Sequence, residues 1–512
     1  MNPSSRVIVN TTAQYIKTFV NVILTLYSTR LILQVLGIDD FGIYTLLAGV
    51  ISMLSFATNA LATTTQRFLS YYQGRSSIEE QKNIFANSFY IHILLGTTTF
   101  VVLIMLTPYL FNGFLNIPEN RLHASMVTYV IVIAILLASF FSSPFRAIII
   151  SHENIVYLTI LDIIDGVLKV VLAIALSHIT YDKLIGYALF LFGIQIFNLF
   201  AIGFYALYKY NECILPNIRR VNRRYISQIS SFAGWTIYSI GCVIGRTQGI
   251  AILLNKFFGA MINAAYGLGF QISGYVNFMS ESLLNAIRPQ LMRAEGENNR
   301  NRMLLLAEIS SKYSFFLLSC LAIPCVVEME TLLSIWLKEV PNYSVLFCRM
   351  VLIASIADST TCGLWVANQA IGNVKQYSIV VNTTKLATFP VSYFLIWMGC
   401  PIYTIAVCFV FFEFLCAILR IPFLAKTGNL NWKIFLVNVF GRVAIPLVVL
   451  IMALTILCYI NSGPYRIIFT FTIPNIIYFF AIFLFGMSKE EKKFIANFIN
   501  NRSERHDKET YK

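Results

Sequence analysis

Long apolar stretches alternate with short polar segments along the whole chain. Fourteen of these stretches reach the length of about 20 mostly apolar residues that a helix needs to cross a bilayer. They lie at 11–36, 41–62, 86–111, 124–149, 155–178, 184–208, 229–254, 264–286, 310–336, 345–370, 378–399, 402–425, 435–460 and 465–486. The pattern predicts an all-α polytopic membrane protein with about 14 transmembrane helices.

The first stretch also carries polar residues at steps of three or four, which places them on one face of a helix. These residues are Asn10, Gln14, Lys17, Asn21, Thr25 and Ser28. A short turn around Gly37 and a second helix ending in a basic loop at Arg75 follow. Since a polar face is unfavourable against lipid, we expect this helix to line a cavity.

An internal repeat appears when the sequence is shifted by about 222 residues. Gly37 then falls on Gly259, and Tyr44 falls on Tyr266. The second helices of both copies carry matching polar stripes, with Ser55, Asn59, Thr63 and Gln66 in one and Asn277, Glu281, Asn285 and Arg288 in the other. We therefore expect two six-helix lobes in parallel orientation, with a transport site between them. The expected parts are a first lobe at 1–208, a basic linker at 209–228, a second lobe at 229–425, two added helices at 426–486 and a charged tail at 487–512.

Composition and charge agree with a membrane protein. The chain of 512 residues is 57% hydrophobic and only 12% charged. Its net charge of +14 does not indicate nucleic acid, because Lys and Arg concentrate in alternate loops, as the positive-inside rule requires. This distribution predicts that both termini are cytoplasmic.

The first span follows only Arg6 and contains polar residues, so we expect it to be retained rather than cleaved. The ten cysteines include no CxxC pair, which argues against a metal site.

Several charged residues fall within predicted spans, where they should face protein or water. The candidate cavity cations are Lys17, Arg30, Lys169, Arg246 and Lys385. Other interpretations stay open for most of them: Lys17, Arg30 and Lys385 can extend to the headgroups, and Lys169 can pair with Asp165 one turn away. For Arg349, Arg420 and Arg442, near span ends, extension to the headgroups is the favoured interpretation.

These cations and the polar faces predict an anionic, hydroxyl-rich cargo, for which a diphosphate carrying sugars is suitable. Gln14, Asn21, Asn59 and Asn277 are the expected polar lining of the cavity. Glu281 and Asp358 are candidates for coupling to Na⁺ or a proton, although either can instead pair with a cavity arginine.

The segment Thr29-Arg30-Leu31-Ile32-Leu33-Gln34-Val35-Leu36-Gly37-Ile38-Asp39-Asp40-Phe41-Gly42-Ile43-Tyr44, followed by Gln66-Arg67-Phe68, resembles the Wzx-type flippases. These belong to the multidrug/oligosaccharidyl-lipid/polysaccharide exporter superfamily. The resemblance implies alternating access between two lobes and transfer of undecaprenyl-diphosphate-linked oligosaccharide from the cytoplasmic to the periplasmic leaflet of the bacterial inner membrane. The product would be O-antigen of lipopolysaccharide, capsule or another surface polysaccharide, and a polymerase and glycosyltransferases would be partners.

Two alternatives remain. A cation-coupled multidrug exporter of the same superfamily would need an acid-lined site, whereas membrane-embedded cations here are at least as numerous as acids. A membrane glycosyltransferase or polymerase would usually carry a long outer loop, which this sequence lacks; we expect Asp39 and Asp40 to balance charge or cap the turn instead. We therefore expect a transporter that is not an enzyme and needs no cofactor beyond a possible coupling ion.

Overall fold

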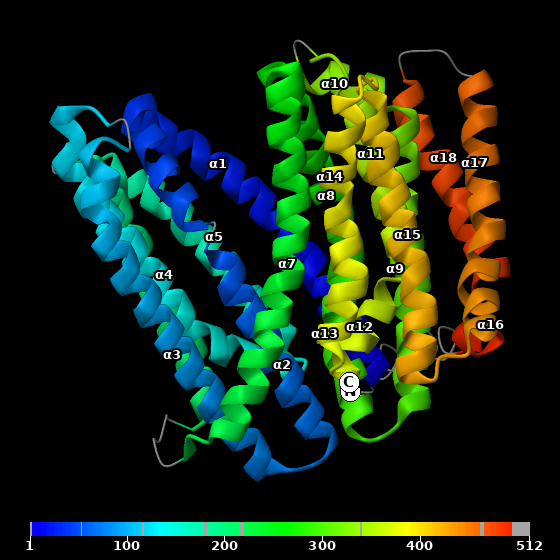
Figure 1. The fold of residues 1–512 in the computed structure, drawn as a ribbon, viewed down its shortest axis with the longest axis horizontal. Coiled ribbons are helices and arrows are strands. Elements are labelled where there is room, and N and C mark those ends of the chain that lie inside the picture. Colours follow the sequence, from blue (N-terminus) through cyan, green and yellow to red (C-terminus); the bar gives the residue numbers. More distant parts are fainter. Residues whose placement is uncertain are drawn as a thin grey trace, which may run out of the picture. The chain divides into compact units, whose positions relative to one another are not determined.

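The computed structural model describes residues 3–52, 54–114, 117–178, 182–214, 220–337, 340–460 and 465–493. Part of the predicted linker (215–219) and most of the predicted tail (494–512) lie outside these residues. The described chain forms helices throughout (Figure 1). The predicted all-α fold is thus confirmed.

The helices of the first half are α1 (Pro3–Ser52), α2 (Ser55–Gly74), α3 (Ile78–Tyr109), α4 (Leu122–Ser151), α5 (Ile155–Leu176), α6 (Lys183–Lys209) and α7 (Arg223–Phe258). Those of the second half are α8 (Ala260–Gly296), α9 (Arg300–Val327), α10 (Met329–Trp336), α11 (Ser344–Ser359), α12 (Cys362–Ile371), α13 (Val374–Tyr377), α14 (Thr383–Trp397), α15 (Tyr403–Gly428), α16 (Trp432–Phe435), α17 (Arg442–Ile460) and α18 (Arg466–Ala481). Short π-helical segments at Leu110–Phe114, Ser378–Asn382, Leu436–Gly441 and Ile482–Gly486 and a 3₁₀ turn at Glu119–Arg121 extend or join them.

Within the described residues, ten helices are long and apolar enough to cross a membrane, or eleven if the bent pair α11 and α12 forms one span with its 51° bend. The three remaining predicted stretches, 41–62, 155–178 and 264–286, are not among them. The first covers the end of α1 and the start of α2 rather than one helix. In α5 the cause is three charged residues, Asp162, Asp165 and Lys169. Large apolar side chains such as Phe200 and Phe204 on α6 are 69% and 76% exposed, as expected of a surface in contact with lipid.

The chain divides into two compact units. Unit 1 comprises residues 1–241, 285–303 and 369–378, and unit 2 comprises 242–284, 304–368 and 379–512. The boundaries cut through α7, α8, α9 and α12. Unit 1 contains the predicted first lobe and pieces of the second, whereas unit 2 contains the rest of the predicted second lobe and the segments that follow it. In unit 2 the two C-terminal helices α17 and α18 run beside each other (Figure 1) and pack on α9 through a buried cluster that includes Phe316, Leu450 and Tyr478.

The predicted repeat recurs in the backbone. Gly37 and Gly259 adopt φ values of 81° and 87°, and each interrupts or separates two helices. Glycine tolerates this left-handed conformation because it lacks a Cβ atom. The two positions are 222 residues apart, which is the offset that the sequence predicts.

The ends of α2 and α8 repeat the same cap. In α2, Arg75, Ser76 and Ser77 donate backbone hydrogen bonds to Tyr71, Gln73 and Tyr72 at 3.4, 3.0 and 3.3 Å. In α8, Glu297, Asn298 and Asn299 donate to Arg293, Glu295 and Ala294 at 2.9, 3.0 and 2.9 Å. Ser76 and Asn298 are both left-handed, with φ of 54° and 56°, as in a Schellman-type helix end. All six donors and acceptors correspond at the same offset.

These two helix ends also contact each other within unit 1. A Cβ atom on Gly74 would collide with the carbonyl oxygen of Arg293, and one on Gly296 would collide with the carbonyl oxygen of Tyr71. Gly74 corresponds to Gly296 and Tyr71 to Arg293 in the repeat, so the contact is reciprocal. We call it the glycine contact; only glycine at both positions lets the two backbones approach this closely.

Candidate functional site

The polar stripe of α1 lies against α4 and α5 in unit 1. The Lys17 Nζ atom forms an ion pair with Asp162 at 3.0 Å, and the Asn10 side chain donates to the Glu153 carbonyl oxygen at 2.8 Å. The side-chain oxygen of Asn21 is buried without a partner, close to Gly166. At these positions the stripe is used for contacts between helices, and its predicted role in lining a cavity stays a prediction.

The acidic residues of α5 each have basic or amide partners. Asp162 accepts hydrogen bonds from Arg146 at 3.0 and 2.8 Å in addition to its pair with Lys17. Asp165 pairs with Lys169 at 2.7 Å, which is the local alternative that the sequence left open. The two carboxylates are therefore neutralised by side chains of the protein itself.

A second set of membrane-embedded charges meets in unit 2. Glu413 on α15 forms ion pairs with Arg246 on α7 and with Lys385 on α14. Lys385 also reaches Asp358 on α11 at 3.0 Å, and Asp358 accepts from Arg420 on α15 at 2.6 Å. We call these five side chains the buried charge network.

The network is largely shielded from solvent. The side chains of Arg246, Glu413, Lys385 and Arg420 are 7, 4, 10 and 5% exposed, whereas Asp358 is 37% exposed. Arg246 also lies 4.2 Å from the centre of the Phe409 ring, in cation–π contact. The expectation that Arg420 extends to the headgroups was wrong, because its guanidinium is buried and paired with Asp358.

The other predicted site residues are dispersed. Arg30, Asn59 and Glu281 are exposed, and Gln14 is buried. Asn277 donates hydrogen bonds to Ser273 at 2.8 Å and Ser355 at 3.1 Å. Of the predicted residues, the structure brings together Arg246, Lys385 and Asp358 in unit 2, while Lys17 and Lys169 occupy separate ion pairs in unit 1.

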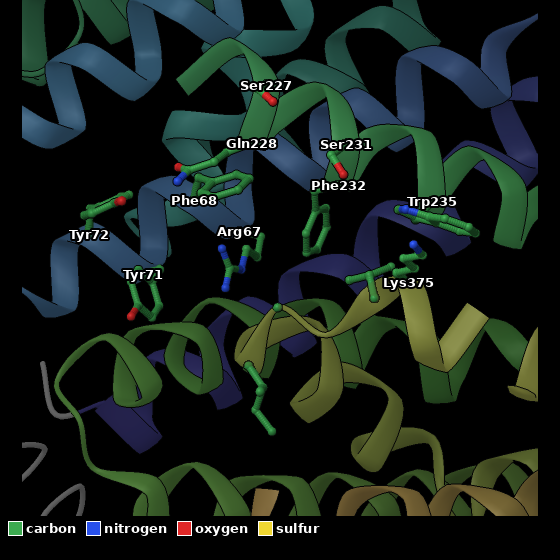
Figure 2. A pocket seen from close by; sticks show the side chains of 13 residues that line it. Arg67, Phe68, Tyr71, Tyr72, Ser227, Gln228, Ser231, Phe232, Trp235 and Lys375 are labelled. Atoms are coloured by element: carbon green, nitrogen blue, oxygen red, sulfur yellow. The ribbon is translucent and has the colours of Figure 1, made fainter. Parts of the chain in front are cut away.

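A cavity of about 520 Å³ opens within unit 1, between the C-terminal part of α2, the N-terminal part of α7 and the turn between α12 and α13 (Figure 2). This volume falls within the range of small-molecule sites. Its lining residues are Arg67, Phe68, Tyr71, Tyr72, Ser227, Gln228, Ser231, Phe232, Trp235, Ile371, Gly372, Val374 and Lys375. None of these residues is acidic.

Arg67 is the buried cation of this cavity, with 7% of its surface exposed. Its Nε atom donates to the Gln369 carbonyl oxygen at 3.1 Å, and its Nη2 atom donates to the Ala370 carbonyl oxygen at 2.8 Å. The guanidinium carbon lies 4.6 to 5.3 Å from the ring centres of Phe68, Tyr71 and Phe232. These partners are uncharged, and among the described residues Arg67 forms no direct ion pair, although the Glu295 carboxylate acts on it from a greater distance.

Gly372 makes room for the guanidinium. It has a φ of 93°, and a Cβ atom at this position would lie 2.8 Å from Arg67 Nη2. A second cation, Lys375, lies 5.6 Å from the Trp235 ring centre (Figure 2). The cavity therefore combines two cations with a wall of aromatic rings.

Sequence reasoning did not single out this cavity. Arg67 enters the sequence interpretation through the flippase resemblance. The available signal was the run Arg67-Phe68 followed by Tyr71-Tyr72, which puts a cation beside aromatic rings on one helix. The pairing with α7 and with the turn at Gly372 required the fold.

Charges also meet near the helix ends. Arg121 pairs with Asp40 and with Asp182, and Asp182 caps α6 by accepting from Leu184 at 3.0 Å.

Elsewhere, Glu212 contacts His152. Burial raises the pKa of the Glu212 carboxyl, but the hydrogen bond and charge of His152 outweigh it and hold the pKa below its ordinary value. In the described part of the chain, no group of three or more His, Cys, Asp or Glu side chains is arranged to hold a metal ion.

Comparisons with known proteins identify the fold. No protein-family model and no curated protein matches the chain. Solved structures do match: a crystal structure of a MATE point mutant has a TM-score of 0.73 at 13% identity, and a MATE in the bent conformation has 0.74 at 12%. Both matches cover 85% of this chain, and 97% and 96% of the respective MATE chains.

A third similar structure is a MOP superfamily transporter from Pyrococcus furiosus, with a TM-score of 0.65 at 11% identity over 85% of this chain and 97% of that one. Its binding pocket is described as having reversed polarity, which suggests a different function for that protein. This chain thus shares the fold of the MATE transporter structures.

Proposed function

We propose that the protein is an alternating-access transporter that moves an anionic, phosphate-bearing oligosaccharide lipid across the membrane. The fold similarity supports a transporter rather than an enzyme. Undecaprenyl-diphosphate-linked oligosaccharide, carried toward the periplasmic leaflet of a bacterial inner membrane, is the cargo that the flippase resemblance favours.

The observation that carries the proposal is the charge balance of the buried charge network. Its side chains comprise three cations and two carboxylates, so one positive charge is in excess. At Asp162, two cations likewise share one carboxylate. Because an uncompensated charge is unfavourable at membrane depth, an excess of cations favours an anionic cargo.

A cation-coupled multidrug exporter is the second candidate, and the comparisons favour it. The similar structures include an outward-facing multidrug resistance MATE transporter, with a TM-score of 0.67. Asp358 and Glu413 also provide carboxylates on neighbouring helices. However, Lys385 and Arg side chains already occupy these carboxylates, which argues against the binding of a cationic drug there.

Transport by the purified parent protein in liposomes distinguishes the two candidates. We expect it to move a fluorescent lipid diphosphate sugar between leaflets and to leave a cationic dye untransported. Flipping should be measured with and without Na⁺ and pH gradients, since coupling through Glu281 or Asp358 would make it gradient-dependent. Dye transport driven by a gradient, without flipping, would contradict the proposal and support the exporter.

A variant then tests the network itself. Arg246→Lys keeps the charge but removes the planar fork that grips phosphate, so we expect weaker flipping with normal membrane insertion. Lys169→Gln, in a pair that is 45% exposed on the lysine side, serves as the matched control. If Arg246→Lys flips the lipid at the same rate as the Lys169→Gln control, Arg246 has no role in the transport mechanism.

A further inference from the structure

We propose that the cavity lined by Arg67, Trp235 and Lys375 is a binding site for a phosphorylated sugar. The site lies within unit 1, whereas the buried charge network belongs to unit 2. The two proposals can therefore fail independently: the cavity can bind its ligand whichever cargo the protein transports.

The phosphate would bind at Arg67. Two of its nitrogen atoms, Nε and Nη2, donate to backbone carbonyl oxygens along one edge of the guanidinium. The opposite edge, formed by Nη1 and the second Nη2 hydrogen, has no partner among the described residues. That edge presents the two-pronged donor geometry that matches phosphate oxygens. Because Arg67 is buried and forms no direct ion pair with a described residue, an entering anion would supply a charged partner in contact with the guanidinium.

Lys375 adds a second positive charge on the exposed side of the cavity. Its ammonium lies over the Trp235 ring and forms no ion pair with any residue that the structure describes. A ligand with one or two phosphate groups can therefore contact a fixed guanidinium in the interior and a movable ammonium at the opening. No lining carboxylate would repel it.

The sugar would bind on the α7 side. Trp235 and Phe232 contribute ring faces, on which the apolar face of a pyranose can pack. Ser227, Gln228 and Ser231 occupy one turn of the same helix, and their exposed side chains offer hydroxyl and amide groups for sugar hydroxyls. Figure 2 shows these side chains on the wall that faces Arg67.

The headgroup of an anionic lipid shares the phosphate chemistry but lacks the sugar. The polar side chains of α7 favour the phosphorylated sugar, and a binding experiment separates the two sources. The full-length protein in neutral detergent would be titrated with N-acetylglucosamine 1-phosphate by calorimetry. In two further arms the same detergent-solubilised protein would be titrated with inorganic phosphate and with N-acetylglucosamine. In the last arm, protein embedded in phosphatidylglycerol nanodiscs would be titrated with N-acetylglucosamine 1-phosphate.

We expect the phosphorylated sugar to bind at least about tenfold more tightly than either of its parts, because both walls then contribute. Lys375→Gln and Trp235→Phe should each weaken binding by about fivefold or more. Both keep the buried Arg67 contacts intact, whereas Arg67→Gln could disturb folding. Arg75→Gln is the matched control, since Arg75 lies 4.9 Å from the Tyr71 ring but does not line the cavity.

Three results would overturn the proposal. They are no binding of the phosphorylated sugar, a loss of its affinity in the Arg75→Gln control as large as in the cavity variants, or equal affinities for inorganic phosphate and the phosphorylated sugar. In phosphatidylglycerol nanodiscs, complete loss of sugar phosphate binding would identify an anionic lipid as the occupant instead. Normal lipid-diphosphate flipping by Lys375→Gln, together with weakened sugar phosphate binding, would leave both proposals standing as separate sites.

Discussion

The glycine contact between the ends of α2 and α8 leads to a sharp prediction for a single methyl group. In Gly74→Ala, the new Cβ atom would lie 2.8 Å from the backbone nitrogen of Glu297 and closer still to the Arg293 carbonyl oxygen. In Gly296→Ala, it would lie 2.8 Å from the carbonyl carbon of Tyr71 and closer to its oxygen. Real Cβ contacts essentially never fall below 3.0 Å, and the opposing atoms are backbone, so one helix end must move.

The cost of such overpacking is about 1–3 kcal/mol when surrounding atoms yield only by backbone shifts. If the ends of α2 and α8 exchange between a packed and a separated arrangement, this cost shifts the equilibrium about 5- to 150-fold toward separation. The intrinsic gain of alanine over glycine in a helix, about 0.5–1 kcal/mol, cancels this cost only at the low end of the range. Each variant should therefore populate a more separated state.

Spin labels introduced as unnatural amino acids at Ile78 and Asn301 report this separation while leaving the ten native cysteines unchanged. Both positions are exposed and follow the two helix ends closely in sequence. Electron–electron double resonance should show one predominant distance in the parent protein. In Gly74→Ala and Gly296→Ala, a longer distance should gain population, and the two variants should behave alike because their contacts are reciprocal.

Gly267→Ala is the matched control, because it adds a methyl group to α8 where no atom lies within 4 Å. Its distance distribution should equal that of the parent protein. If Gly74→Ala and Gly296→Ala also keep the parent distribution, the reasoning from backbone proximity is refuted. A large change in only one of the two would refute reciprocity.

Three other predictions concern paired carboxylates. Glu413→Gln should destabilise the protein by about 3–5 kcal/mol, because it leaves buried cations uncompensated, and a thermal melt in detergent should show this against Lys169→Gln, which should change little. Glu328→Gln should cost about 2 kcal/mol, since its fully buried side chain accepts from Arg466 at 2.8 and 2.7 Å; an unchanged melting temperature would contradict this. The lowered pKa of Glu212 means that its contact with His152 stabilises the fold above the ordinary carboxyl pKa of 4.5 and is lost as pH falls through the lowered pKa. Melts of the parent protein and Glu212→Gln should therefore differ at neutral pH and converge in acid, and a constant difference would exclude the linkage.

Much of the fold could be predicted because it depends on local signals. Apolar length identified the spans, and the offset of Gly37 and Gly259 identified a repeat whose helix breaks the structure reproduces. The same offset also relates Gly74 to Gly296, yet sequence alone could not show that these glycines contact each other. Contact between helix ends more than 200 residues apart depends on tertiary packing, which periodicity does not encode.

The site was harder to predict because ion pairing joins distant helices. Hydropathy gives the depth of Arg420 near a span end, but it cannot reveal Asp358 as its partner on another helix. Lys385 was recognised as an embedded charge, although its simultaneous contacts with Asp358 and Glu413 depend on the packing of α11, α14 and α15. For Lys169, where the partner lies one turn away, the sequence contained the pairing itself.

The reciprocity of the glycine contact has a consequence for the repeat as a unit. Tyr71 with Gly74 and Arg293 with Gly296 are equivalent pairs in the two repeats. In each pair the glycine lies against the carbonyl oxygen of the other pair. Such a contact is isologous, like the interface of a twofold-symmetric dimer, although it lies inside one chain. A single repeat carries both faces of the contact, so two separate copies of one repeat have the means to join at this point.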